Sequence, residues 1–219
     1  MRIVNLEPSH LADYIRAQIT AIAPTGPDAE LGLIDVHLPQ ALARLEQCIA
    51  SVRMWRAGEF DVLHSSQHCT FVYFLANTIW RHERARSVCT KLFLLNKAHH
   101  AIDCFYEIAL PEVFFIGHSP GIVLAKATYG NRLVIYQGVT VGRNGDAAPV
   151  IEDEVILYPG SAVIGGCRIA RGSVLSQGTR LTDRDTEPGR IAFPGAGGVP
   201  VFRRPGRELL ADFFRDPAA

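Results

Sequence analysis

Between residues 151 and 181 an aliphatic side chain returns at every sixth position, a spacing that no helix produces. The aliphatic residues are Ile151, Leu157, Val163, Ile169, Leu175 and Leu181. One short extended segment plus one turn per unit is typical of a hexapeptide-repeat solenoid, in which stacked units bury the aliphatic column. Chance spacing of short strands in an ordinary β fold would not keep one phase for so long. Beyond an interruption at residues 142–146, the six-residue step continues backwards through Val141 and Ile135, and less regularly through Tyr129 and Val123.

Charge and cysteine content narrow the partners of such a chain. The 219 residues are 48% hydrophobic, enough for a compact core, and 22 basic side chains balance 22 acidic ones. A balanced chain carries no electrostatic footprint for nucleic acid or an anionic membrane, so we expect small-molecule partners. The five cysteines include no CxxC pair and are odd in number, which favours reduced thiols, and the N-terminus has no signal-peptide pattern. We therefore expect a cytoplasmic protein.

Residues 1–108 show helical periodicity instead. Ser9 precedes an i, i+4, i+8 apolar stripe that ends at Ile22, which predicts a capped helix. Further helices are expected at residues 38–52, from about residue 66 to 84, and at 87–105. The uncharged run in the third is too short to span a bilayer and indicates a buried helix. After this helical domain we expect a solenoid over residues 109–185 and an extended tail with a short apolar helix over residues 186–219.

Residues 117–142 contain a more specific pattern. His118 is followed by two residues, Gly121 and three aliphatics, and Gln137 opens a Gln-x-Val-Thr-Val-Gly run. Over about residues 101–200 the chain resembles the serine acetyltransferase branch of the hexapeptide acyltransferases. The resemblance implies an α+β fold, in which an N-terminal all-helical domain precedes a left-handed parallel β-helix, an exception to right-handed crossovers. It also implies homotrimers, which could pair into hexamers, and acetyl-CoA as co-substrate between neighbouring coils, with no metal.

His118 is the candidate general base. It is the only histidine between residues 101 and 219 and lies among glycine, serine and proline rather than on an apolar stripe. An imidazole exchanges protons near neutrality, and the resemblance implies that it deprotonates an acceptor hydroxyl or amine, which then attacks the acetyl thioester. A carboxylate should orient the imidazole. The resemblance implies Asp103 for this role, with Glu107 as a competing candidate, although either could be an ordinary surface acid.

The acceptor pocket departs from the family pattern. Where serine acetyltransferases carry Asp-Arg-His-Pro, this chain has Asp146, Ala147, Ala148 and Pro149, and Gly117 replaces the aspartate that normally precedes the base. Without that arginine, the bidentate donor for an acceptor carboxylate is lost. We therefore predict a sugar or nucleotide-sugar acceptor. The alternatives are serine O-acetylation in cysteine biosynthesis and a catalytically inactive solenoid that binds a partner.

A hexapeptide carbonic anhydrase is a third class to weigh. Its zinc would need three histidines from the coils, and a single one is present.

The resemblance also implies a groove for acetyl-CoA along the coils. The candidate residues are Gly142 and Arg143 in the loop that shapes the active-site mouth, Tyr158, Pro159, Gly160, Gln177 and Gly178 at coil corners, and Arg203 and Arg204 in the closing segment. The two closing arginines could equally be surface charges. His99 and His100 are adjacent on a predicted helix and should diverge, so we interpret them as structural.

Overall fold

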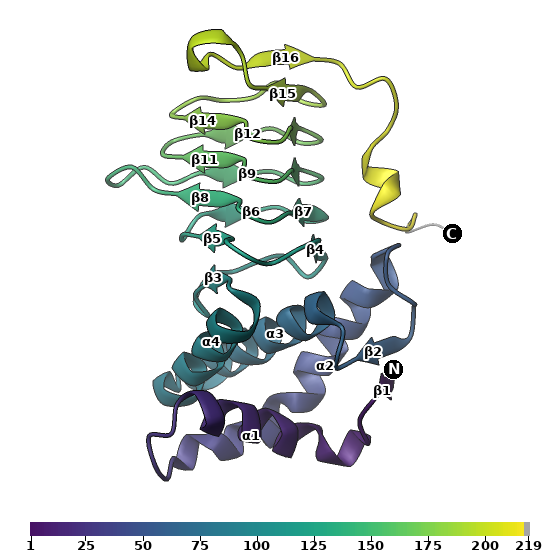
Figure 1. Ribbon diagram of the computed structural model, residues 1–219, viewed down its shortest axis with the longest axis vertical. Helices are drawn as coiled ribbons and strands as arrows, with labels where there is room; N and C mark the ends of the chain where they lie inside the picture. Colours follow the sequence, from purple (N-terminus) through teal and green to yellow (C-terminus); the bar gives the residue numbers. More distant parts are fainter. Residues whose placement is uncertain (217–219) are drawn as a thin grey trace.

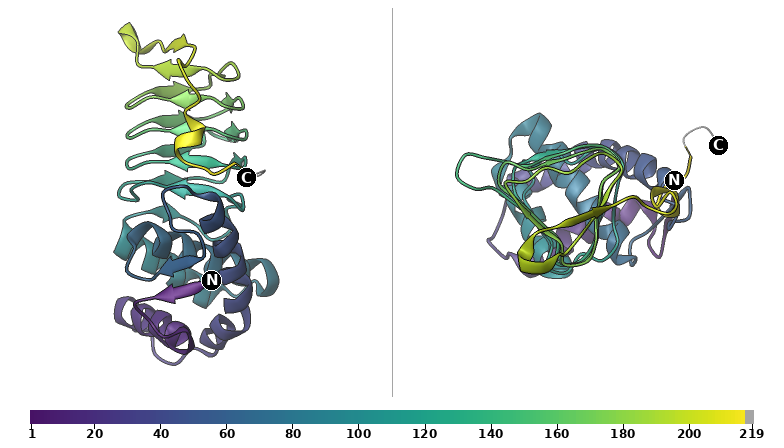
Figure 2. Two further views of the ribbon diagram at one scale, coloured as in Figure 1. Left: turned by 90° about the vertical axis from the view of Figure 1, so that its right-hand side faces the viewer. Right: turned by 90° about the horizontal axis from the view of Figure 1, so that it is seen from above.

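The computed structural model describes residues 1–216 and shows a parallel β-solenoid standing on a helical base (Figure 1). The end of the predicted C-terminal segment, residues 217–219, lies outside the described residues. The chain climbs from the helices through the coils, and its C-terminal segment then returns along the outside of the solenoid to the base (Figures 1 and 2). The predicted order, a helical region followed by a parallel solenoid, is confirmed.

Four α-helices build the base, one at each of the segments in which the apolar periodicity predicts a helix. They are α1 (Leu11–Ile22), α2 (Leu33–Ser51), α3 (Ser65–Glu83) and α4 (Arg86–His100). Two short parallel strands, β1 (Arg2–Val4) and β2 (Glu59–Asp61), pair beside them. α3 is buried along most of its length, which explains its apolar sequence. No helix within residues 1–216 is long and apolar enough to cross a membrane.

The N-terminal ends of two helices differ from the prediction. Ser9 does not cap α1, because it lies in a short 3-10 helix and His10 takes the N-cap position without a side-chain hydrogen bond. α2 starts at Leu33 instead of residue 38 and runs through Pro39. The fully buried Ile34 extends the apolar stripe backwards, and this packing outweighs the helix-breaking tendency of the proline.

The solenoid also begins earlier in the chain than predicted, because α4 ends earlier. The helix stops at His100 rather than at residue 105, because Ala101 adopts a left-handed conformation (φ 50°, ψ 35°) and its N–H donates to the Lys97 carbonyl. The next strand, β3 (Asp103–Cys104), already pairs with a solenoid strand. The solenoid therefore begins near residue 103, ahead of the predicted residue 109.

Three sheets form the sides of the solenoid, which has a triangular cross-section when seen from above (Figure 2). The orders are β16-β15-β13-β10-β7-β4, β14-β11-β8-β5-β3 and β12-β9-β6, all parallel except for the β15–β16 pair. The remaining strands are β4 (Phe114–Ile116), β5 (Val123–Leu124), β6 (Thr128–Tyr129), β7 (Leu133–Ile135), β8 (Thr140–Gly142), β9 (Val150–Ile151), β10 (Ile156–Leu157), β11 (Ala162–Ile164), β12 (Arg168–Ile169), β13 (Val174–Leu175), β14 (Arg180–Thr182), β15 (Ile191–Phe193) and β16 (Val201–Arg203).

The six-residue period is the inward-facing column of this solenoid. Its aliphatic members between residues 151 and 181 are no more than 1% exposed. The backward extension to Val123 is wrong, since that residue is 44% exposed and Leu124 packs in the core instead. The step from Leu124 to Tyr129 is five positions, so a strict six-residue step back from Tyr129 arrives one residue too early.

One edge of the prism, here called the His118 edge, consists of the turns 117–122, 136–139, 158–161 and 176–179. These turns join the six-stranded sheet to the five-stranded sheet. They stack through backbone bonds of 2.9–3.0 Å, from Gly138 N–H to Pro120 O, Gly160 N–H to Gln137 O and Gly178 N–H to Pro159 O. The three glycines have φ of 68–72°, which side-chain-bearing residues rarely adopt.

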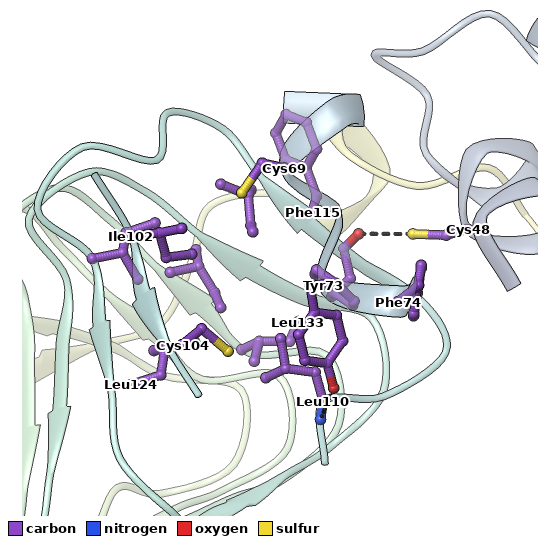
Figure 3. Close-up of a cluster of buried hydrophobic side chains, with 14 of the residues drawn as sticks. Cys48, Cys69, Tyr73, Phe74, Ile102, Cys104, Leu110, Phe115, Leu124 and Leu133 are labelled. Atoms are coloured by element: carbon purple, nitrogen blue, oxygen red, sulfur yellow. Dashed lines mark hydrogen bonds between the residues drawn. The ribbon is translucent and has the colours of Figure 1, made fainter. Parts of the chain in front are cut away.

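A buried apolar cluster joins the base to the first coils (Figure 3). The Cys48 thiol of α2 donates to the Phe114 carbonyl of β4 over 3.1 Å, and burial raises the pKa of this thiol to about 12. The Tyr73 hydroxyl of α3 donates to the Ile108 carbonyl and accepts from the Leu110 N–H, both at 2.8 Å. These contacts fix the base against the lowest rungs of the solenoid.

The C-terminal segment is a strap between the two ends of the molecule. The predicted apolar helix at residues 208–214 shrinks to the short 3-10 helix Leu210–Asp212. Phe214 forms an isolated antiparallel bridge with Val52. The Arg215 guanidinium donates to four main-chain carbonyls, those of Ile49, Ala50, Val52 and Trp55. These carbonyls lie at and just beyond the C-terminal end of α2, where a cation is favourable.

We expect Arg215→Ala to lower the free energy of unfolding by about 2 kcal/mol, because it removes charge-assisted hydrogen bonds to carbonyls at the end of α2. Urea denaturation followed by circular dichroism measures the change. Arg204→Ala is the matched control, since that exposed side chain makes no hydrogen bond or ion pair within residues 1–216. Equal urea midpoints for the two variants would show that the hydrogen bonds of Arg215 do not stabilise the fold.

Candidate active site

A cavity of about 570 Å³ opens where the helical base meets the first coils. Three segments of the base reach it: the region after α2, the N-terminal end of α3 and the C-terminal end of α4. The opposite wall comes from β4, the turn after it and Tyr136. The lining residues are Met54, Trp55, His64, Ser65, Ser66, Ala98, His99, His100, Ala101, Phe115, Gly117, His118, Ser119, Pro120 and Tyr136.

His118 lies on the solenoid wall of this cavity, in the first turn of the His118 edge. Its side chain is exposed, and its ring centroid is 6.1 Å from that of Tyr136. The imidazole makes no hydrogen bond to any residue in the described part of the chain. A ring nitrogen is therefore free to take a proton from a molecule in the cavity.

The two candidate orienting acids lie at opposite ends of β5. Asp103 comes two residues after Ala101, whose carbonyl accepts the N–H of Gly121 in the turn that carries His118. Its carboxylate pairs with Lys97 at 2.7 Å. The Glu107 carboxylate pairs with Lys126. Lys126 follows β5 whereas His118 precedes it, so Glu107 is held beyond the opposite end of that strand.

A buried network lies behind the helical wall. His100 Nε2 and His68 Nδ1 are 2.8 Å apart, His68 Nε2 is 3.1 Å from Gln18 Oε1, and Ser65 Oγ is 3.3 Å from His100 Nδ1. Since the Gln18 amide oxygen can only accept, the protons run in one direction, from Ser65 to His100, His68 and Gln18. Burial lowers the pKa of His68 to about 3 and that of His100 to about 4, with neighbouring imidazoles adding to both shifts.

The helical wall is the part of the site that sequence reasoning missed. His99 and His100 were expected to be structural, yet both line the same cavity as His118, although only His100 belongs to the buried network. His64 and Ser65, at the start of α3, were not singled out at all. The one available signal was that His64 and Ser65 lie just before the start of a predicted helix, where side chains can face a neighbouring domain.

The candidate cofactor residues separate into three groups. Tyr158, Pro159, Gly160, Gln177 and Gly178 lie on the His118 edge, in the turns above Tyr136, and the rings of Tyr136 and Tyr158 stack with centroids 5.6 Å apart. The other two groups lie elsewhere.

Gly142 ends β8 and Arg143 follows it, at a different edge, where they begin the loop that projects from the solenoid in Figure 1. Asn144 and Ala147 exchange two backbone bonds of 3.0 Å across this loop, and the Asn144 amide donates to Asp183. Ala147 and Ala148, which replace the family's arginine and histidine, therefore do not line the cavity of their own chain.

Arg203 and Arg204 lie in and after β16, at the far end of the solenoid. In the six-stranded sheet β15 stands four rungs above β4, a rise of about 19 Å. The Arg203 guanidinium lies over the Phe193 ring at 5.9 Å. Any contact of these arginines with a ligand would be remote from His118.

Comparisons with known proteins give a consistent family. No family model matches the chain. It is 28% identical over 167 residues to the serine acetyltransferase of Bacillus licheniformis, covering 74% of this chain and 77% of the relative. The serine acetyltransferase of Bacillus subtilis is 27% identical over 157 residues, covering 65% of this chain and 72% of the relative.

Solved structures share the fold. Serine acetyltransferase from Brucella abortus superposes with a TM-score of 0.65 at 17% identity, over 89% of this chain and 84% of that one. Serine acetyltransferase 1 from Entamoeba histolytica, solved with L-cysteine, gives 0.63 at 19% identity, over 84% and 75%. In both cases the likeness concerns the architecture.

Together, the sequence relatives, the solenoid and its helical base define an acetyl-CoA-dependent acetyltransferase of the hexapeptide-repeat class. Within that class the chain is similar to the serine acetyltransferase-like branch, as its sequence relatives indicate. The resemblance noted at His118 and Gln137 is thereby confirmed.

The buried histidine pair predicts loss of stability in weak acid. His68 and His100 stay neutral in the folded protein down to about pH 4, whereas both protonate below about pH 6.5 when the chain unfolds. The unfolded state then binds more protons, so stability falls as the pH drops from 6.5 towards 4, by up to about 2.7 kcal/mol per unit for two groups. Urea denaturation across this range measures the slope.

The matched comparison is His68→Gln against His118→Ala. The first removes one buried titrating group and should flatten the slope, whereas the second changes an exposed imidazole and should leave it as in the parent. A parent protein whose stability is level between pH 6.5 and 4.5 would show that the pair is not held neutral.

Proposed function

We propose that this protein transfers the acetyl group of acetyl-CoA to the hydroxyl of L-serine, with His118 as general base. The observation that carries the proposal is an exposed imidazole without an internal partner on the wall of a substrate-sized cavity. The serine acceptor is supported by the curated relatives, which are named serine acetyltransferases. They favour this alternative over the sugar acceptor that the sequence led us to prefer.

The chemistry needs one proton transfer in each direction. His118 removes the proton of the acceptor hydroxyl while its oxygen attacks the thioester carbonyl carbon. The N–H groups of His118 and Ser119 have no acceptor within residues 1–216 and are available to the oxyanion of the tetrahedral intermediate. When the carbon–sulfur bond breaks, the imidazolium returns its proton to the thiolate, leaving the O-acetyl ester and free CoA.

Acetyl-CoA supplies the activated acetyl thioester, and the His118 edge is the surface that fits it. A Cβ placed on Gly160 or Gly178 would meet no atom within 4 Å, so this edge is open, with its backbone accessible. Tyr136 and Tyr158 add a flat aromatic surface beside it. In this proposal Tyr158, Pro159, Gly160, Gln177 and Gly178 hold the pantetheine arm.

The position of the loop supports the proposed homotrimer. Gly142 and Arg143 begin a loop at a different edge from His118, so both can contribute to one site only if the loop comes from a neighbouring copy. Val123 and Val150, on the outer faces of the five- and three-stranded sheets, are 44% and 41% exposed and offer apolar contacts for it. A pair of trimers joined through the helical base would give a hexamer.

The location we propose is the cytoplasm. The five cysteines are all free and buried, which suits a reducing compartment.

A sugar or nucleotide-sugar acceptor remains the second candidate, because one observation favours it. Ala147 and Ala148 occupy the positions of the family's arginine and histidine, and neither can bind a carboxylate. An acceptor without a carboxylate would not need them.

A free-thiol assay with acetyl-CoA against panels of amino acids and nucleotide sugars decides between these acceptors. We expect L-serine to be turned over, and His118→Ala to lower kcat by about 10² to 10⁴ because a positioned base contributes that much. Tyr106→Phe serves as the control, because Tyr106 does not line the cavity. Turnover confined to nucleotide sugars would reverse the order of the two candidates, and no thiol release with any acceptor would indicate an inactive solenoid.

The orienting carboxylate can be identified by a matched pair of variants. We expect Asp103→Asn to lower kcat about tenfold or more and to shift the pH–rate profile, because a neutral side chain no longer stabilises the imidazolium. Glu107→Gln should have little effect, since that side chain is held at the opposite end of β5. Equal losses in both variants would assign neither acid to His118.

A further inference from the structure

The cavity beside His118 contains no fixed charge. None of its lining residues is aspartate, glutamate, lysine or arginine. Two of its histidines are accounted for: His100 is held neutral by burial, and His118 is the proposed base. Within one copy, the cavity therefore offers an amino-acid acceptor no acidic side chain, lysine or arginine, and its backbone groups become the candidates for binding the carboxylate and ammonium groups.

Two helix ends of opposite polarity meet at this cavity. Ser65 and Ser66 open α3, and their backbone N–H groups have no acceptor within residues 1–216. Ala98 and His99 belong to the last turn of α4, and their carbonyls have no donor in the same part of the chain. All four residues line the cavity. An N-terminal end carries about half a positive charge and a C-terminal end about half a negative charge.

The two ends are close together because their terminal side chains are bonded. Ser65, the first residue of α3, lies 3.3 Å from the His100 Nδ1 at the end of α4. A free amino acid carries its two charges on one carbon atom, so it needs an anion site and a cation site side by side. An adjacent pair of opposite helix ends has this arrangement.

Ser119 supplies an independent observation that points to a ligand site. Its side chain is only 3% exposed and lines the cavity, yet its hydroxyl has no hydrogen-bond partner within residues 1–216. The hydroxyl oxygen itself is not fully buried, so it can exchange hydrogen bonds with a molecule in the cavity. Ser119 directly follows His118, so a group bound to it lies next to the proposed base.

We propose that the cavity binds its acceptor as an amino-acid zwitterion, with the carboxylate at the N-terminal end of α3 and the Ser119 hydroxyl, and the ammonium group at the C-terminal end of α4. This inference rests on the proposed serine acetylation and names the groups that replace the missing arginine at position 147. Ser119 is a specificity-determining residue in this arrangement.

Trp55 allows binding to be measured without turnover. It lines the cavity, and Trp80 is the only other tryptophan, so a Trp80→Phe background leaves Trp55 as the single indole reporter. Fluorescence titrations in the absence of acetyl-CoA then give Kd values for L-serine, L-serinamide, 3-hydroxypropanoate and a neutral methyl glycoside. Serinamide lacks the carboxylate charge, and 3-hydroxypropanoate lacks the ammonium group.

We expect serinamide and 3-hydroxypropanoate each to bind at least about tenfold more weakly than L-serine, since each loses a hydrogen-bonded charge. Ser119→Ala should weaken L-serine about tenfold and raise its KM with little change in kcat. Ser161→Ala is the matched control, because Ser161 is also buried with an unpartnered hydroxyl but does not line the cavity, and it should leave the Kd unchanged. Ala98→Lys should reverse the preference towards 3-hydroxypropanoate, since a fixed ammonium then occupies the α4 end.

Equal affinities for the charged and neutral ligands, or equal Kd values for Ser119→Ala and Ser161→Ala, would overturn the inference. The thiol assay on the same proteins separates this result from failure of the proposed function. Serine acetylation with a KM that is insensitive to Ser119 rejects the zwitterion site alone. The expected binding series without any acetylation of serine rejects the proposed function alone.

Discussion

Backbone hydrogen bonding between coils is the constraint on which the rest of the structure depends. Each coil is held about 4.8 Å from the next, so the height of every turn along the solenoid is set by its coil number. The aliphatic column drives the stacking, and the turns at Gly138, Gly160 and Gly178 keep the His118 edge in line. A side chain at a corner therefore has little freedom in position, which suits the role proposed for this edge of holding a long substrate beside His118.

The other half of the site depends on how the base docks against the lowest coils. The bonds from Cys48 to Phe114 and from Tyr73 to Ile108 and Leu110 fix α2 and α3 relative to β4 and the segment before it. His118 follows β4 directly, so these buried contacts also set its distance from the ends of α3 and α4. The strap that ends at Arg215 closes the same junction from the outside. Packing at the junction thus decides the shape of the cavity.

The repeating coils could be predicted from the sequence, whereas the surface formed where the helical base packs against the solenoid could not. The six-residue period placed the buried column from Ile135 to Leu181, and the stacked corners could be anticipated because corners recur in phase with the column. The slip at Val123 arose because one step contains five residues, a local irregularity that a period cannot show. The helical wall with His64 and His100 could not be predicted, because no periodicity in one domain specifies the surface that the other will cover.

The neutrality of the buried histidine pair connects the core of the base to the proposed site. Were His100 protonated, its charge at the last residue of α4 would compensate the negative helix end and repel an ammonium group there. Burial and the proton order from Ser65 to Gln18 keep His100 uncharged, so the carbonyls of Ala98 and His99 retain their partial charge towards the cavity. An acceptor cavity without charged side chains avoids the desolvation cost of a fixed ion, and it can still distinguish the two ends of a zwitterion. In the proposed arrangement the absence of an arginine at position 147 is compatible with an amino-acid acceptor, because backbone groups at the two helix ends take over its role.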